Sequence, residues 1–479
     1  MLKREPSPAL RLETARVLSW AGEFTESINS YRQFLEQEPM DTEAILGLAR
    51  VLSWSRNYDE SLQTYRQVIE QDPANRDARV EYARVTSWKG DLDQAIRLYS
   101  DLETYYPDDR DVLLGKGQAL QWAGRAAEAE RILTPLRDAH PTDREVLLAM
   151  AGTQLALGRG DLAMRSLQVA ESTAPDDRDV QLMRSLVLRQ VRPVLTFGFS
   201  PSFDSDDLHI LPYASTFYFS PLPGVRSYVR GAVIQSSIPS GGIFQGREAV
   251  FGSTAQVAPW LILRGEIGAN SSSIGRHGSI GSGGFTLLPS SQLRFDFDAS
   301  RQFINYLPTT VDLDISRVQF RVGGDYRPVR DLTLHLDYTH GRYSDTNRSN
   351  AANLTVTRTV LRSERVTLEG GYLYAVTGFS EQTGSGYFAP SQLQRHAALA
   401  NLYGRFTSWA GYNVSGTLGE EQAFRDPFRF DGTLRVSTDL SFAERFKLTL
   451  GYGYFRIASL ARAGAYRTHS VFSILEFRF

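Results

Sequence analysis

The sequence contains no cysteine and no run of about 18 to 20 apolar residues, the length that a helix needs to cross a bilayer. The first absence suits an oxidising compartment of the cell envelope. The second excludes a transmembrane helix. The chain also has little net charge, because 52 Lys and Arg residues oppose 54 Asp and Glu residues. A net charge of −2 argues against nucleic acid as a partner.

Signatures of catalysis are missing as well. The seven histidines form no metal-ligand pair at helical spacing. The sequence has neither a nucleophile-elbow motif nor a phosphate-binding loop. We therefore expect no enzyme activity, no catalytic residue, no bound metal and no cofactor.

What the sequence does contain is a repeat. Tryptophan recurs every 34 residues at Trp20, Trp54, Trp88 and Trp122, and proline keeps the same step at Pro39, Pro73, Pro107, Pro141 and Pro175. This period is the length of one helix–turn–helix unit of a helical solenoid. Each proline would end one unit and open the next. We expect an α-solenoid over residues 1–191, with about five repeats and a closing helix from Arg178 to Gln190.

Other positions of the period agree with this interpretation. Small residues recur where the two helices of a unit approach closely, at Ala15, Ala49, Ala83, Gly117 and Ala151. Glycine recurs at the turn between the helices, at Gly22, Gly90, Gly124 and Gly158. The pattern resembles the tetratricopeptide-repeat family over roughly residues 8 to 177. Arg56 departs from it by replacing a turn glycine, and Ala156 by replacing a fifth tryptophan.

The repeated tryptophans allow two interpretations. Each could fill the solenoid core where the helices of its unit meet the next unit, or the row could stack on sugar rings. We favour the core, so these residues serve as the repeat scaffold. The concave groove of a solenoid is the usual place for a partner.

From Pro193 onward the helical period ends and apolar residues alternate with polar ones, as in Leu332–Thr339. Strands of about 10 residues with this pattern cross a bilayer as a β-barrel. We expect a 16-stranded antiparallel transmembrane β-barrel over residues 192–479. Its strands would lie near 194–203, 209–219, 226–236, 245–257, 260–271, 277–287, 291–301, 315–326, 332–342, 349–360, 366–376, 395–406, 411–419, 429–440, 446–457 and 467–479.

The connections between these strands alternate in length. Tight turns such as 221–224 and 327–330 alternate with longer stretches at 302–314, 377–394, 420–428 and 458–466. Short turns are typical of the periplasmic side, and an even number of strands returns both ends of the barrel to that side. The chain ends on Leu475, Phe477 and Phe479 at alternate positions. This looks like the terminal strand that the outer-membrane insertion machinery recognises in bacterial barrels.

Alternate residues of a strand point to opposite faces of the sheet. If the set with the apolar residues (the apolar phase) faces lipid, the other set lines a lumen. The predicted inner wall carries Arg294, Asp296, Asp298, Arg317, Gln319, Arg321, Asp325, Asp337, Arg429, Asp431, Arg435, Asp439, Glu476 and Arg478. These side chains could neutralise each other as cross-strand ion pairs, or form a track on which a polar polymer slides through many weak contacts. The two roles are compatible. His335 and Asp337 share one strand face, and we interpret them as hydrogen-bonding groups of a wet wall rather than an acid–base pair.

The order of the two domains resembles that of outer-membrane exporters of bacterial exopolysaccharides, such as those for cellulose and poly-N-acetylglucosamine. It is also similar to that of the smaller YaiO-like outer-membrane proteins, whose repeats contain a Leu-Ser-Trp sequence like that at Leu18-Ser19-Trp20. The resemblance implies a barrel in outer-membrane lipid, a polysaccharide chain in its lumen, and a periplasmic arm whose groove recruits synthesis or modification proteins. A passive small-solute porin and a barrel-anchored structural or assembly scaffold are the alternatives.

The beginning of the chain does not match this location. Met1 to Arg4 are basic, but no apolar segment and cleavage site follow them. Because an outer-membrane protein must be exported, we expect the natural chain to begin further upstream, with a signal peptide and room for further repeats.

Overall fold

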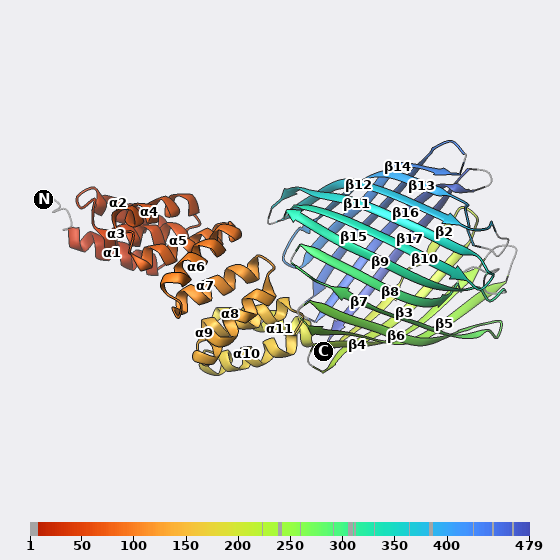
Figure 1. Cartoon of the computed structure of the whole chain (residues 1–479), viewed down its shortest axis with the longest axis horizontal. Helices are drawn as coiled ribbons and strands as arrows, with labels where there is room; N and C mark the ends of the chain where they lie inside the picture. The colour runs from red at the N-terminus through yellow and green to blue at the C-terminus, as the bar shows by residue number, and fades with distance from the viewer. Residues whose placement is uncertain are drawn as a thin grey trace. The chain divides into compact units, whose positions relative to one another are not determined.

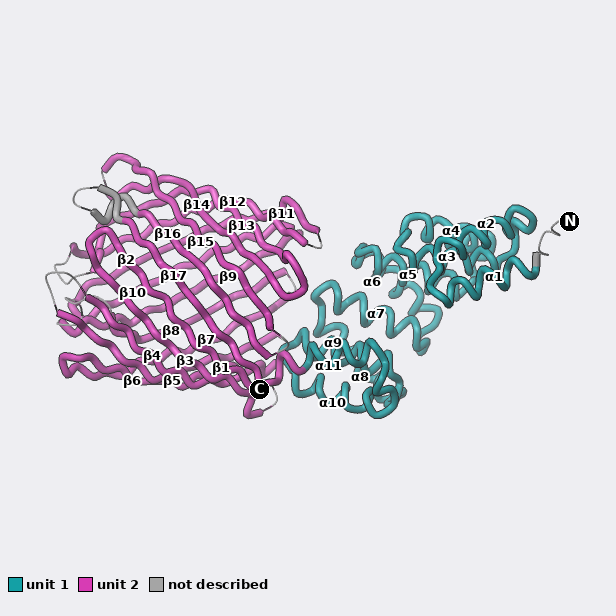
Figure 2. The backbone as a smooth tube through the Cα atoms, turned by 180° about the vertical axis from the view of Figure 1, so that it is seen from behind, with its two compact units in different colours: residues 1–187 teal, residues 188–479 magenta. Residues whose placement is uncertain are grey.

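The computed structural model describes residues 8–479 apart from 223, 238–241, 259, 291, 305–309, 311–312, 330, 364, 383–386, 425, 443–444 and 462–463. The chain divides into two compact units, Met1–Val187 and Leu188–Phe479, which Figure 2 shows in two colours. Unit 1 is helical, and unit 2 consists of strands that follow the end of the last helix (Figure 1).

The helices form five pairs and a closing helix, as predicted. They are α1 (Pro8–Trp20), α2 (Phe24–Leu35), α3 (Thr42–Trp54), α4 (Tyr58–Gln71), α5 (Arg76–Lys89), α6 (Leu92–Tyr105), α7 (Arg110–Trp122), α8 (Ala126–Ala139), α9 (Arg144–Ala156), α10 (Gly160–Thr173) and α11 (Arg178–Val191). Among the residues that the structure describes, no helix is long and apolar enough to cross a membrane.

From α3 to α9, the first helix of each pair begins at a capping residue that recurs with the period. Asp109 accepts hydrogen bonds from two backbone N–H groups at the start of α7, and Asn75 caps α5 by accepting from the N–H of Ala78. At the other end, Gly90 has a φ of 98°, the left-handed conformation that glycine adopts without strain. Arg56 adopts a φ of 62° at the equivalent turn, so the departure from the repeat pattern keeps the turn geometry.

The core of unit 1 lies between the helices of the pairs. The predicted close-contact residues Ala15, Ala49 and Ala83 are fully buried. Tyr99 is 1 % exposed, and its hydroxyl would lie 2.4 Å from a Cβ added at Gly115. The ring therefore occupies the space that a side chain at Gly115 would need, and the large and small positions of the repeat fit together.

Arginines at the start of alternate helices join successive repeats. Arg76 donates through Nε to Asp109 at 2.7 Å, and Arg110 donates through Nε to Asp143 at 3.0 Å. The same contact recurs one unit later at Arg144. The hydrogen bond from Arg76 holds the pKa of Asp109 below its usual value. Burial opposes such a shift at Asp143, but the hydrogen bond from Arg110 contributes to a net lowering of its pKa.

Unit 2 is a single antiparallel sheet that closes on itself. Its strands are β1 (Val194–Phe199), β2 (Ser202–Asp204), β3 (His209–Leu222), β4 (Val225–Ser237), β5 (Ile243–Ala258), β6 (Leu261–Ser272), β7 (His277–Leu287), β8 (Leu293–Phe303), β9 (Ser316–Val329), β10 (Leu332–Tyr343), β11 (Arg348–Arg362), β12 (Val366–Phe379), β13 (Leu393–Arg405), β14 (Ala410–Ala423), β15 (Arg429–Phe442), β16 (Phe446–Ala461) and β17 (Gly464–Arg478).

The seventeen segments make sixteen barrel strands. Both β1 and β2 pair with β17 on one side and with β3 on the other, so together they fill one place in the barrel. The predicted first strand, 194–203, is thus interrupted at Ser200 and Pro201. Pairing of Val194 with Arg478 at the start of this strand joins the first and last strands and closes the barrel. The fold class is confirmed: a helical repeat solenoid followed by a closed sixteen-stranded antiparallel barrel.

The connections distinguish the two ends of the barrel. We call the end where Val194 and Phe479 lie the near end, and the opposite end the far end. The longest connections, 304–315 and 380–392, are at the far end, as predicted. Two predicted long loops are shorter, because β14 continues to Ala423 and because the segment 458–466 is mostly strand in β16 and β17. Far-end connections 205–208, 273–276 and 344–347 are also short.

Candidate functional site

The two faces of the barrel differ in chemistry. Successive side chains of a strand point to opposite faces. On β8, β9, β10 and β15 one face presents exposed apolar residues, including Phe295, Phe320, Leu336 and Leu434. The residues between them form a polar network across the strands. That network is the inner wall, and all thirteen charged residues predicted for the lumen have the inner phase.

One part of the network spans β6 to β8. Arg264 donates through Nε to Asp298 at 2.7 Å and through Nη1 to the hydroxyl of Thr286 at 2.6 Å. Thr286 donates in turn to Asp296 at 2.5 Å, and Arg294 donates to Asp296 at 2.8 Å. Asp296 and Asp298, two of the predicted lumen carboxylates, therefore share Arg264 as a cationic partner.

A second part of the network lies on β9 and β10. The imidazole of His335 is 2.6 Å from Asp325 through Nδ1 and 3.4 Å from Asp337 through Nε2. Arg321 lies 3.6 Å from Asp337. His335 thus lies between two carboxylates on one wall.

A third part of the network joins β13, β14 and β15. Asp431 is 0 % exposed and pairs with Arg395, which also donates to Thr417 at 2.7 Å. Thr417 and Thr433 are linked by a hydrogen bond of 2.8 Å. Arg429 stands directly opposite Glu421 in the register of β14 and β15.

The remaining predicted residues complete the wall. Lys447 lies 3.3 Å from Asp439, and Arg478 pairs with Glu476. Each of the seven predicted lumen carboxylates therefore has a cationic or imidazole partner. Two predicted arginines have other partners: Arg317 donates to the side-chain oxygen of Gln302 at 3.3 Å, and the guanidinium of Arg435 lies 4.3 Å from the centre of the Phe472 ring. No carboxylate pairs with Arg435 in the part of the chain that the structure describes.

Sequence reasoning missed several members of this wall. Arg264, Arg395 and Lys447 supply cations to predicted carboxylates, and Glu266 accepts a hydrogen bond from Tyr228. The signal was present in the sequence. Each residue lies in a predicted strand at the phase opposite the apolar side chains, as Arg264 does between Leu263 and Gly265.

The outer wall carries aromatic residues at both ends of its apolar band. Trp260, Phe406, Trp409, Phe442 and Phe446 are exposed near the turns of the near end, and Phe203, Tyr213 and Phe430 are exposed toward the far end. Two aromatic belts around an apolar band are typical of transmembrane barrels. The proposed insertion signal lies on this wall too. Phe477 packs against Phe446 and Phe479, with ring centres 4.9 and 4.6 Å apart.

The repeat tryptophans lie elsewhere than we expected. Trp20, Trp54, Trp88 and Trp122 are 76, 43, 38 and 46 % exposed, so the prediction that they fill the solenoid core is wrong. They end the first helices of their pairs, or stand one residue before the end, where the side chain reaches the surface beside the turn. The ring of Trp54, for example, is 43 % exposed and lies beside Phe24, with ring centres 6.5 Å apart.

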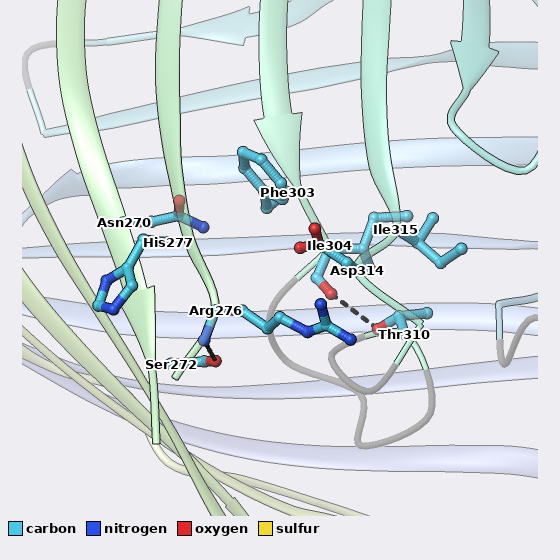
Figure 3. Close-up of a pocket in the computed structure, with 9 residues that line it drawn as sticks. All are labelled: Asn270, Ser272, Arg276, His277, Phe303, Ile304, Thr310, Asp314 and Ile315. Atoms are coloured by element: carbon cyan, nitrogen blue, oxygen red, sulfur yellow. Dashed lines mark hydrogen bonds between the residues drawn. The ribbon is translucent and has the colours of Figure 1, made fainter. Parts of the chain in front are cut away.

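Two smaller hollows differ greatly in size. Unit 1 has a polar depression of about 270 Å³ on its first helices, lined by Arg50, Arg76, Asp77, Val80, Glu81, Arg84, Arg110, Asp111 and Glu145. A small pocket at the far end of the barrel holds only about 20 Å³, room for a water molecule, between the β6–β7 hairpin and the loop after Phe303 (Figure 3). There the hydroxyl of Thr310 donates to the carbonyl of Ile304 at 2.7 Å.

Metal chemistry finds no support in the described ranges, where no group of three or more His, Asp or Glu side chains could hold a metal ion. The candidate functional site is therefore the lumen, with the surface of unit 1 as a second candidate.

A comparison with protein-family models finds a match in the helical unit. Residues 20–186 match the tetratricopeptide-repeat family model in four overlapping segments, 20–79, 55–119, 89–146 and 123–186. These residues are therefore tetratricopeptide repeats. No curated protein matches the sequence.

Solved structures add a likeness in fold. A protein described as bacterial polysaccharide outer membrane secretin is 12 % identical with a TM-score of 0.51, over 60 % of this chain and 98 % of its own. A thermophilic repeat protein from Thermus thermophilus is 22 % identical with a TM-score of 0.34, over 38 % of this chain and all of its own. The pilus biogenesis factor PilW is 16 % identical with a TM-score of 0.34, over 38 % and 85 %.

Proposed function

We propose that the protein is an outer-membrane pore through which a bacterial exopolysaccharide leaves the cell. The observation that carries this proposal is the inner wall of the barrel, which is densely charged and yet paired. In the same chain stands a tetratricopeptide-repeat solenoid, a scaffold that binds partners. The structural neighbour from a polysaccharide system supports the same conclusion.

The paired wall suits a polymer of hydroxyl groups. A sugar chain slides only if its contacts are numerous and individually weak, since one strong site would hold it. Carboxylates and guanidinium groups that already neutralise each other still offer hydrogen-bond donors and acceptors at their edges. A ring of unpaired charges of one sign would instead select ions. The lumen therefore fits a polymer better than an ion.

The solenoid completes the proposal. We place the near end, with its short turns, in the periplasm, so that unit 1 lies there and receives the polymer or the proteins that make or modify it. A passive porin has no use for such an arm. The exposed tryptophans and the polar depression of unit 1 are the surfaces available for these partners. In this proposal the chain is a passage and does not catalyse a reaction.

The test is export in the living cell. A strain without the gene should stop secreting its exopolysaccharide, and the full chain supplied in trans should restore secretion. Normal secretion in the deletion strain would refute the proposal and leave the small-solute porin. Conductance across planar bilayers separates both pores from a scaffold, because a plugged anchor conducts no ions.

Two arginines in similar surroundings, one on each wall, test whether the exported polymer passes through the lumen. Arg435 and Arg456 both lie over an aromatic ring, at 4.3 Å from Phe472 and 5.1 Å from Phe430, but Arg435 is on the inner wall and Arg456 on the outer. Because each contact of the wall is weak, Arg435→Gln should reduce secretion only in part while the barrel stays folded, and Arg456→Gln should leave secretion unchanged. Equal secretion by the two variants would contradict a lumen route.

A further inference from the structure

Three arginines form a row on the outer wall at the far end of the barrel. Arg301 of β8 stands opposite Val318 of β9, Val318 stands opposite Arg342 of β10, and Arg342 stands opposite Arg348 of β11. Val318 is exposed among the apolar outer residues, so the row has the outer phase. All three arginines are exposed. Neighbouring strands lie about 5 Å apart, which puts three cations within about 15 Å.

The row is a juxtaposition of like charges. Two arginines directly opposite each other on one face of a strand pair repel and destabilise the sheet. In the part of the chain that the structure describes, no carboxylate lies within ion-pair distance of Arg301, Arg342 or Arg348. The near end behaves differently, since Arg362 lies 3.7 Å from Asp331. The far-end row therefore requires an anion that the protein does not supply.

The middle arginine is held in place by its neighbours. Arg342 donates through Nε to Nε2 of His340 at 3.4 Å, and Nδ1 of His340 is 2.9 Å from the side-chain oxygen of Asn350. The hydroxyl of Tyr338 donates to the same oxygen at 2.6 Å. These contacts run along the outer wall toward the rim. They orient the guanidinium before any ligand arrives, which reduces the entropy lost on binding.

The position of the row identifies where the anion comes from. Along the same strands, toward the barrel middle, lie the exposed apolar side chains Phe320, Leu336 and Leu354. A ligand that reaches the row from the apolar band must place its acyl chains on these residues and its charge on the arginines. Guanidinium groups bind phosphate through paired hydrogen bonds.

We propose that Arg301, Arg342 and Arg348 bind the phosphate groups of a phosphorylated membrane lipid in the leaflet that surrounds the far end. This inference rests on the membrane placement in the proposed function. A lipid held there would satisfy the charges of the row and fix the barrel at a defined depth in the bilayer. In the proposed orientation, this leaflet is the outer one.

The test measures lipid binding by the full chain in detergent, with native mass spectrometry. The probes are bisphosphorylated lipid A, the same lipid without its phosphates, and inorganic phosphate. We expect the phosphorylated lipid to bind, the dephosphorylated lipid to bind much more weakly, and inorganic phosphate not to compete. Each arginine changed to glutamine should weaken lipid A binding about fivefold. Arg358→Gln is the matched control, because Arg358 has the same phase of β11 ten residues from Arg348, toward the near end.

A second measurement separates binding from folding. Arg348→Gln removes one of two opposed like charges, so it should raise the thermal unfolding midpoint of the barrel in lipid-free detergent and reduce the additional stabilisation by lipid A. If Arg348 had a purely structural role, the midpoint in lipid-free detergent and the additional stabilisation by lipid A would change in the same direction. A variant with all three arginines changed to glutamine should lose lipid A affinity. Unchanged affinity in that variant, or an equal loss of lipid A affinity in Arg358→Gln, would overturn the proposal. Because purified protein is measured, a chain that exports no polymer can still pass this test.

Discussion

Replacing Arg110 by methionine tests how successive repeats hold together. Arg110 donates to Asp143 through Nε at 3.0 Å and through Nη2 at 2.9 Å, and Nη2 also donates to Glu145 at 2.7 Å. The side chains of Arg110 and Asp143 are 29 and 24 % exposed. Hydrogen bonds to charged groups contribute about 1.5–3 kcal/mol, and exposed ion pairs less than about 1 kcal/mol. For this half-screened bidentate pair we expect about 1–2 kcal/mol.

The measurement is a double-mutant cycle, since Asp143 also caps α9 by accepting from the N–H groups of Glu145 and Val146. The chain supplies its own control: Asn75 caps α5 at the equivalent position, so Asp143→Asn should keep the cap and lose only the charge. Urea unfolding of Arg110→Met, Asp143→Asn and the double variant, followed by helical circular dichroism of the full chain in detergent, gives the coupling energy. A coupling energy near zero would refute the reasoning.

Three other predictions use the same kind of measurement. Arg56 has a φ of 62° at a turn where other units have glycine, so Arg56→Gly should stabilise unit 1 by about 1 kcal/mol. Gly90→Arg should destabilise unit 1 for the same reason. Urea unfolding midpoints equal to that of the unchanged chain would contradict this. Because the folded-state pKa of Asp109 is lowered, its stabilisation is complete above the unfolded pKa of about 3.9 and is lost as the pH falls through the folded pKa. Helical signal should therefore persist down to about pH 4, and loss at pH 6 would contradict it. A Cβ at Gly451 would lie 2.0 Å from the Phe472 ring, so Gly451→Val should cost the barrel about 1–3 kcal/mol in heat unfolding, whereas an unchanged midpoint would exclude this packing.

Periodicity predicted most of the fold because period and burial have the same cause. A residue such as Ala49 recurs every 34 positions since each unit needs one small side chain where its helices touch, and Ala49 is indeed fully buried. Alternation worked for the barrel in the same way, since a strand such as β10 must be apolar on the side of Leu336. Strand ends were less predictable. β16 continues to Ala461 through a segment that we expected to be a loop, because hydrogen bonding between strands can extend beyond the apolar band.

The tryptophans show where periodicity fails. A recurring residue is under a recurring constraint, but the constraint does not have to be burial. Tyr65 recurs with the same period and is 0 % exposed, whereas Trp54 is 43 % exposed. Both are large and aromatic, so size and hydrophobicity alone could not separate them. The difference is position: Tyr65 lies inside its helix against the neighbouring unit, and Trp54 is the last residue of α3.

Partners in the lumen could not be predicted for a related reason. The phase of a strand tells which face a residue takes, but the register between strands decides which residue it meets. The prediction placed Asp298 on the inner wall, and its partner Arg264 lies 34 residues earlier on a strand that is not its direct neighbour. A long guanidinium reaches across the small residue Gly284 on β7, and only the assembled sheet shows this.

The two walls of the barrel use arginine in opposite ways, and the contrast favours a polymer passage. On the inner wall, cations such as Arg264 and Arg395 meet carboxylates and leave few strong sites for a moving chain. On the outer wall, Arg342 and Arg348 face each other, which is costly unless a stationary anion lies between them. If the barrel were only an anchor, pairing inside would have no function beyond stability, and apolar packing could replace it at no cost. A wall whose charges are paired leaves a route through the lumen open, because it offers a moving chain no strong binding site.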